Sequence, residues 1–214
     1  MSTREETRRD FEIEQKGLRE HLLCENCETQ LSDYEGYARD QFDSDRFRVE
    51  GNPAVEVSGL DSDKLRLFFL SILWRSSIST LEFFREVELG PHQETAREMI
   101  LKENPKPFWR YGCILADIAE YDENQRDVII QPVSSKEDAR HHYFYVLGGF
   151  LWHYVVSSHR LEDSIERLFI DHSGTMTIPS KNPDNIPFIN QLRTELHDEG
   201  KLQALINQYD EEDS

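Results

Sequence analysis

Two cysteines, Cys24 and Cys27, stand three positions apart in the N-terminal part of the chain. This Cys-x2-Cys spacing lets two thiolates bind one zinc ion from a single tight turn. Zinc in structural sites takes four ligands. The remaining candidates are His21, which is close in sequence, and Cys113, the third cysteine. The sequence therefore predicts a zinc site built from these four residues.

Two other interpretations of the cysteine pair stay open. A redox-active dithiol needs the pair at the N-terminus of a helix that follows a buried strand, because the helix dipole then lowers the pKa of the first thiol. The helical spacing after Glu28 fits this requirement, but residues 21–23 are too few to predict a strand. Alternatively, the cysteines are reduced, partly buried and without a chemical role.

A second candidate pair is His142 and His153. Both lie in residues 141–157, which are predicted to form a β-hairpin turning at Gly148-Gly149, because both positions of a type I′ turn need positive φ. In this register the two histidines are diagonal neighbours on one face, within reach of a shared metal or substrate group. No third ligand is visible beside them, so two histidines on the wetter face of a sheet is the simpler interpretation.

The opposite face of the same hairpin is aromatic. It carries Tyr143, Tyr145, Trp152 and Tyr154. Such a face could stack RNA bases. Because no lysine or arginine is interleaved with the rings, we expect this face to pack under helices instead.

Arg75 is a further candidate binding residue. It follows Trp74 at the end of the most apolar stretch of the chain, so its guanidinium could clamp a carboxylate or a phosphate. The alternative is an internal ion pair, for which Glu35 and Glu82 are the candidate acids.

The charge of the chain restricts its partners. Forty-two acidic residues against 24 basic ones give a net charge of -18 over 214 residues. A field of this sign repels phosphate backbones and argues against nucleic-acid binding by this chain alone. It suits a protein partner, and a basic one in particular, although acidic surfaces also serve solubility. Three cysteines do not make a disulfide framework, and the charged N-terminus contains no apolar targeting segment, so a cytoplasmic location is predicted.

Residues 65–78 form the organising element. The sequence LRLFFLSILWRSSI is apolar on every side at a period of 3.6, which indicates a buried central helix. The run is too short to span a bilayer. Asp61 or Ser62 is the expected N-cap, and the helix is expected to continue to about Val87. Further helices are predicted from just after the cysteine pair to about residue 42, and over residues 93–101 after the Gly90-Pro91 break.

Strands follow the Pro-rich segment 104–107. Residues 111–118 and 127–133 are candidate strands before the histidine hairpin. A second hairpin is expected from 168–170 to 175–178, turning at Ser173-Gly174, and Phe47 and Val49 could form a short strand. A last helix is expected over residues 185–209. The predicted class is α+β: a helical N-terminal half with a buried central helix, packed on a small antiparallel sheet, with a C-terminal helix.

The expected organisation is one compact unit with two charged ends. Residues 1–17 are a charged tail, 18–104 the helical part with the Cys-x2-Cys pair, 108–209 the sheet with its helix, and 210–214 an acidic tail. The two central parts are expected to pack as a single domain.

Three segments resemble a widespread family of bacterial and phage proteins with an HNH-endonuclease-like zinc-finger module. These are KGLREHLLCENCETQLSDYEGYARDQF, GLDSDKLRLFFLSILWRSSIS and FFREVELGPHQETAREMIL, so the resemblance covers roughly residues 16–103. In that family such a knuckle is the second half of the zinc-finger module, which implies zinc bound by Cys24 and Cys27. In true HNH nucleases a histidine of an upstream segment is the general base.

This chain departs from the family pattern at the catalytic half. Residues 1–16 contain neither a cysteine nor a histidine, and Glu28 stands where such nucleases often have His or Asn. We therefore expect either a shortened member or a true start upstream of Met1, and no nuclease activity from the chain as printed.

Three functional hypotheses follow. The first is a non-catalytic acidic interaction or regulatory protein related to HNH-like zinc-finger proteins, acting in phage–host conflict or on a basic partner. The second is an HNH-type endonuclease or nucleic-acid-binding component whose catalytic half comes from another segment or subunit. The third is a metal-dependent hydrolase built on His142 and His153. A homodimer is compatible with each.

Overall fold

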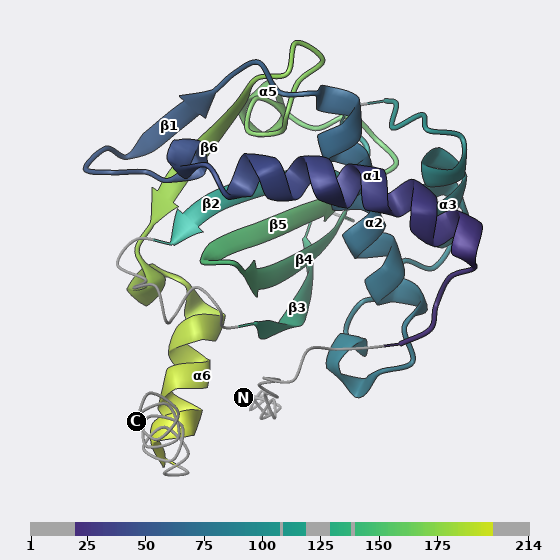
Figure 1. The fold of residues 1–214 in the computed structure, drawn as a ribbon. Helices are drawn as coiled ribbons and strands as arrows, with labels where there is room; N and C mark the ends of the chain where they lie inside the picture. Colours follow the sequence, from purple (N-terminus) through teal and green to yellow (C-terminus); the bar gives the residue numbers. More distant parts are fainter. Residues whose placement is uncertain (1–19, 108, 119–128, 138–139, 199–214) are drawn as a thin grey trace, which may run out of the picture.

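The fold is a six-stranded sheet with its helices on the outside (Figure 1). The computed structural model describes residues 20–107, 109–118, 129–137 and 140–198. The strands lie in the order β1-β6-β2-β5-β4-β3. Their bounds are Ala54–Val57 for β1, Gly112–Ile118 for β2, Ile130–Glu137 for β3, Arg140–Leu147 for β4, Phe150–Val156 for β5 and Met176–Lys181 for β6. The predicted α+β class is confirmed.

The longest helices cover one face of this sheet, and α1 crosses in front of it in Figure 1. The helices are α1 (Glu25–Phe42), α2 (Ser62–Ile78), α3 (His92–Leu101), the short α5 (Asp163–Glu166) and α6 (Pro187–Asp198), with 3-10 turns at Asp45–Phe47, Glu82–Phe84 and Pro183–Asn185. The main hydrophobic core joins α1, α2 and α3 to β2, β4 and β5. The helical part and the sheet therefore share one core.

The central helix α2 begins as expected and ends earlier than expected. The Asp61 carboxylate accepts the backbone N–H of Lys64 at 3.0 Å, so Asp61 is the N-cap. The helix stops at Ile78, and the prediction that it continues to Val87 is wrong. At its end the Glu20 carboxylate accepts the Ser79 hydroxyl at 2.6 Å and the Thr80 N–H at 3.0 Å, which holds the chain in extended geometry there. Among the described residues no helix has the length and apolar character to cross a membrane.

The β4–β5 hairpin has the predicted turn and register. Gly148 and Gly149 have φ values of +63° and +74°, as a type I′ turn requires. Leu147 pairs with Phe150, so every residue of the hairpin falls on its predicted face. The aromatic face packs under the helices as expected: the Tyr154 hydroxyl donates to the Phe69 carbonyl of α2 at 3.1 Å.

The sheet is mixed, so the expectation of an antiparallel sheet is wrong for one pair of strands. β6 runs parallel to β2 through Asp117 and Ser180, and antiparallel to β1. The antiparallel partner of β6 is β1, a strand that the sequence did not predict. The expected hairpin from 168–170 to 175–178 is therefore also wrong. Residues 168–170 leave the helix α5 as a loop, and the Phe169 ring lies directly against Gly112 of β2, where a Cβ would be 2.2 Å from the ring.

The expected strand at Phe47 and Val49 is wrong as well. Phe47 ends a 3-10 turn and is fully buried, while Arg48 and Val49 bind the carboxylate of Asp117. The predicted helix 93–101 is confirmed as α3. The last helix is described for Pro187–Asp198; its predicted continuation to residue 209 and the tails 1–17 and 210–214 lie outside the described residues.

Candidate functional site

The cysteine pair lies at the start of α1. Cys24 is the N-cap residue and Cys27 sits in the first turn, so the helix begins between the two, and their Sγ atoms are 3.4 Å apart. Cys24 is exposed and Cys27 is half-buried. The backbone N–H of Cys27 lowers the pKa of the Cys24 thiol, while the hydrogen bond from Cys24 raises the pKa of Cys27.

The other two predicted zinc ligands do not complete this site. Cys113 is buried in β2, where burial raises its thiol pKa far above the usual value, and His21 is exposed before α1. Within the described residues no group of three or more His, Cys, Asp or Glu side chains could hold a metal ion. The Sγ separation of 3.4 Å is close to the edge of a ZnS4 tetrahedron, about 3.8 Å, so the pair fits two of the four positions. Zinc stays a prediction that needs further ligands from elsewhere.

The histidines lie together, as expected, on the sheet face away from α1 and α2. Nδ1 of His142 and Nε2 of His153 are 2.8 Å apart, and the His153 ring stacks on Phe144 with centroids separated by 4.4 Å. Burial lowers the pKa of His153 to about 4, with a smaller contribution from His142. The two nitrogens face each other, so one must donate and the other accept, and neither of these atoms is directed at a shared ligand.

Arg75 forms an ion pair within the fold. Its Nη2 lies 2.7 Å from Oε1 of Glu35, one of the two acids expected, and its Nε donates to the Ser71 carbonyl at 3.3 Å. This pair connects α2 to α1, so the guanidinium is already engaged.

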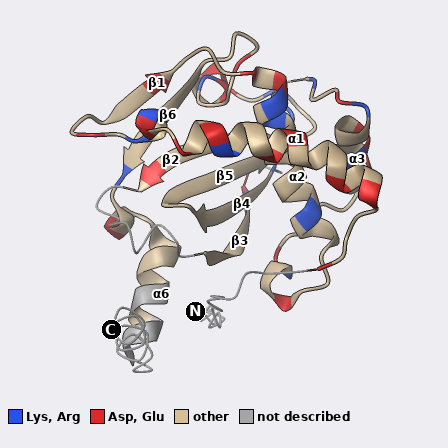
Figure 2. Ribbon diagram, in the orientation of Figure 1, with Lys and Arg blue, Asp and Glu red and all other residues tan. Residues whose placement is uncertain are grey.

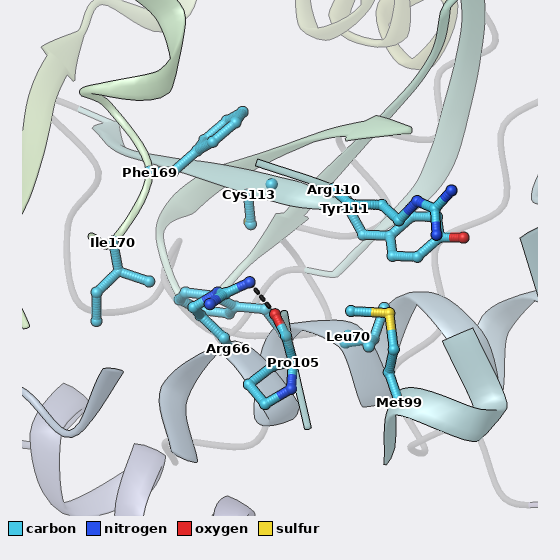
Figure 3. A pocket seen from close by; sticks show the side chains of 11 residues that line it. Arg66, Leu70, Met99, Pro105, Arg110, Tyr111, Cys113, Phe169 and Ile170 are labelled. Carbon is cyan, nitrogen blue, oxygen red and sulfur yellow. Dashed lines mark hydrogen bonds between the residues drawn. The ribbon is translucent and has the colours of Figure 1, made fainter. Parts of the chain in front are cut away.

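A small pocket lies where α2, α3 and β2 meet (Figure 3). Arg66 points into it and donates to the Pro105 carbonyl, and Cys113 and Phe169 close it from the sheet side. Burial lowers the pKa of Arg66 to about 10. The space amounts to about 20 Å³, enough for roughly one water molecule. This pocket is too small for an organic ligand.

A much larger groove lies between α1 and the β4–β5 turn, with a volume of about 820 Å³. Four aromatic residues line it, Phe42, Phe68, Phe150 and Trp152, of which the last two are almost fully buried. The other lining residues are Ser32, Glu35, Gly36, Arg39, Asp43, Arg48, Leu147 and Gly148. The rings form a continuous cluster, in which Phe42 stacks on Trp152 with centroids 5.5 Å apart. We refer to this feature as the aromatic groove.

Arg48 holds the aromatic groove in shape. Its Nη1 binds Oδ1 of Asp117 at 2.8 Å, its Nη2 donates to the Gly148 carbonyl at 2.9 Å, and its guanidinium lies 4.0 Å above the Phe150 ring. The Val49 N–H donates to the second Asp117 oxygen at 2.9 Å. One arginine thus ties the segment after α1 to the end of β2 and to the hairpin turn, so the groove is preformed.

Acidic residues lie along α1 and its continuation (Figure 2). The exposed ones are Glu25, Glu28, Asp33, Asp40, Asp43 and Asp45. Arg39 stands among them at the groove edge, with its Nε 3.9 Å from the Asp40 carboxylate. The lining of the groove itself carries two acids, Glu35 and Asp43, and two arginines, Arg39 and Arg48, so the excess of negative charge lies along α1 and not inside the groove.

The sequence did not predict this groove. The sequence predicts that a helix ends near Phe42 and that Trp152 belongs to the aromatic face, but the contact between the two rings depends on where α1 crosses the sheet. The usable signals were Gly36, unusual inside a helix, and Arg48, placed after a buried aromatic residue.

No known protein family matches this chain, and neither a curated protein nor a solved structure is similar to it. The resemblance to HNH-like proteins therefore stays a prediction.

Proposed function

We propose that this chain is a non-catalytic binding protein, which accepts an apolar side chain of a basic protein segment in the aromatic groove. The observation that carries the proposal is the groove itself, recessed, aromatic and held open by the Arg48–Asp117 pair. A volume of about 820 Å³ lies within the usual range of ligand sites, roughly 300–1,000 Å³. Aromatic walls of this kind are typical of the pockets that receive the anchor residues of a partner.

Charge complementarity selects the class of partner. The net charge of -18 and the exposed acids along α1 attract a cationic segment and raise its association rate at low salt. The same field disfavours a phosphate backbone. We therefore propose a basic protein partner rather than a nucleic acid.

The ion pairs around the groove leave it open to such a segment. Glu35 is bound by Arg75, and Arg48 is bound by Asp117, so these charges position the groove. Asp40 and Asp43 are exposed near its edge. We expect the partner's cations to lie along these acids while its apolar anchor enters the groove.

Gly36 provides a direct test. A Cβ at this position would meet no atom within 4 Å, so Gly36→Trp fills the groove without entering the core. The probe is a lysine-rich peptide with one central leucine, and its dissociation constant is measured by calorimetry. Thr29→Trp, which adds the same side chain at an exposed α1 position outside the groove, is the matched control.

We expect Gly36→Trp to weaken peptide binding at least tenfold and Thr29→Trp to leave it unchanged. A second peptide with serine in place of the leucine should bind the wild type as weakly as the first peptide binds Gly36→Trp. Equal binding of both peptides, or no effect of Gly36→Trp, would show that only diffuse charge attraction is present and would overturn the proposal.

A further inference from the structure

The start of α1 presents two thiols to solvent in contact with each other. Cys24 and Cys27 are one helical turn apart, which places their side chains on the same face. Their Sγ atoms are 3.4 Å apart, and closing a disulfide of about 2.05 Å requires them to approach by only about 1.4 Å. The geometry needed for a bond between them is therefore nearly present in the reduced protein.

We propose that Cys24 and Cys27 form a redox-active dithiol that exchanges with the disulfide of an external peptide. The thiolate of Cys24 attacks one sulfur of the substrate disulfide, which forms a mixed disulfide and releases the first substrate thiolate. Cys27 then loses its proton to solvent and attacks the Cys24 sulfur, which closes the protein disulfide and releases the second thiolate. The protein is oxidised by two electrons, and the substrate disulfide is reduced to two thiols.

The exposure of the two residues matches these roles. The attacking sulfur must reach a substrate, and Cys24 is exposed at the N-terminus of α1. The resolving sulfur must reach only Cys24, and Cys27 is half-buried within contact of it. The helix start expected of a redox dithiol is present, whereas the expected strand before it is not, since residues 20–24 form no strand. The exchange itself uses only the two sulfur atoms, whereas a structural zinc site needs four ligands.

A pocket beside the pair suggests the kind of disulfide. It has a volume of about 240 Å³, and its walls include Leu23 and Glu28, the chain neighbours of the two cysteines. Leu22, Ile72, Leu81 and Phe84 add apolar surface to this pocket, and Glu20, Arg75, Ser76 and Ser79 add polar atoms. An apolar side chain next to the substrate cysteine would fit there. The negative charge of the protein disfavours an anionic disulfide such as oxidised glutathione.

The test follows disulfide exchange in the reduced full-length protein. A symmetric disulfide of a short peptide that contains lysine and leucine beside its cysteine is one probe, and oxidised glutathione is the other. The products are trapped by acid and alkylation and identified by mass spectrometry. Cys24→Ser and Cys27→Ser are compared with the wild type, and the metal content of each preparation is measured. Buried Cys113 is the internal control and should stay reduced.

We expect the wild type to lose two hydrogen atoms, Cys27→Ser to accumulate the mixed disulfide on Cys24, and Cys24→Ser to react at least tenfold more slowly. The peptide disulfide should react at least tenfold faster than oxidised glutathione. Wild-type protein that stops at the mixed disulfide would overturn the proposal. So would zinc on these thiols that blocks the reaction until a chelator removes it, since the pair would then be a metal site. A faster reaction with glutathione would overturn the peptide assignment.

Discussion

The two faces of the β4–β5 hairpin differ in what they contribute. One face carries aromatic rings that lie under α1 and α2, and two of them, Phe150 and Trp152, line the aromatic groove. The other face carries His142 and His153, whose ring nitrogens contact each other. The two histidines, which have the more reactive side chains, thus form a hydrogen bond with each other. The aromatic rings, in contrast, help to form the groove that we propose as the binding site.

The largest effect is expected on the aromatic face. Trp152 is buried, and its Nε1 donates to the Leu147 carbonyl at 3.0 Å. Trp152→Ala removes this bond and one of the four aromatic residues that line the groove, and should lower the free energy of unfolding by about 4 kcal/mol. Phe144→Ala removes a ring that is only half-buried on the opposite face, and should cost no more than about 2 kcal/mol. Urea titrations of both variants check this, and equal losses would contradict the difference between the faces.

The second largest loss of stability is expected at Arg48–Asp117, the ion pair that shapes the groove. The side chains of Arg48 and Asp117 are only 17% and 9% exposed, so Asp117→Ala leaves a largely desolvated guanidinium without its carboxylate. We expect a loss of about 3 kcal/mol in the free energy of unfolding. Glu35→Ala breaks the more exposed pair with Arg75, at 41% and 27%, and should cost less than about 1 kcal/mol. Similar losses for the two variants would mean that Arg48 does not hold the groove.

We expect acid to lower the stability of the fold through His153, on the sheet face that carries the two histidines. The pKa of His153 is about 4 in the folded protein, because of its burial and then of the nearby His142 and Lys181, against 6.5 in an exposed chain. His153 binds a proton at a higher pH in the unfolded chain than in the folded protein, so its protonation favours the unfolded state. Its stabilising contribution is therefore fully present above pH 6.5 and is lost as the pH falls toward 4, by about 2–3 kcal/mol.

Thermal melts between pH 7 and pH 4 measure this loss. His153→Gln should remove most of the pH dependence in that window. His141→Gln, at an exposed position on the neighbouring strand β4, should leave it intact. An unchanged slope in His153→Gln would show that the carboxylates alone account for acid sensitivity.

The smallest expected effect is a gain in the free energy of unfolding. Gly36 lies inside α1 with open space at its Cβ position, so Gly36→Ala should raise the free energy of unfolding by about 1 kcal/mol. The methyl group is too small to close the groove, and peptide binding should be retained. Thermal melts and calorimetry on one preparation test both statements. A loss of stability would mean that the helix is strained at this position.

Local signals in the sequence predicted part of this molecule. The Gly148-Gly149 pair predicted the hairpin register, and with it both faces, because a two-residue turn leaves one pairing. The Asp61-Ser62 pair predicted the start of α2 for a similarly local reason, and Asp61 is the N-cap. The end of α2 depends on Glu20, which is 59 positions from Ser79, and no pattern within the helix indicates it.

Long-range pairing limited the rest of the prediction. β1 and β6 lie far apart in the sequence and are both short, so neither segment carries a signal that indicates their pairing. The aromatic groove depends on the angle at which α1 crosses the sheet and on the Arg48–Asp117 pair, 69 positions apart. The spacing of the cysteine pair is a clear signal in the sequence. The contact between its sulfur atoms, in contrast, depends on the position at which α1 begins.

The most direct measurement of the central claim is the position at which a lysine-rich, leucine-anchored peptide binds, mapped by backbone amide shifts in the wild-type protein. We predict that the shifts concentrate at Gly36, Arg39, Gly148 and Phe150, with the indole N–H of Trp152 among them, and that residues 140–144 around His142 do not respond. Shifts spread over the acidic surface, or gathered at the histidine face, would contradict the assignment of the aromatic groove as the binding site.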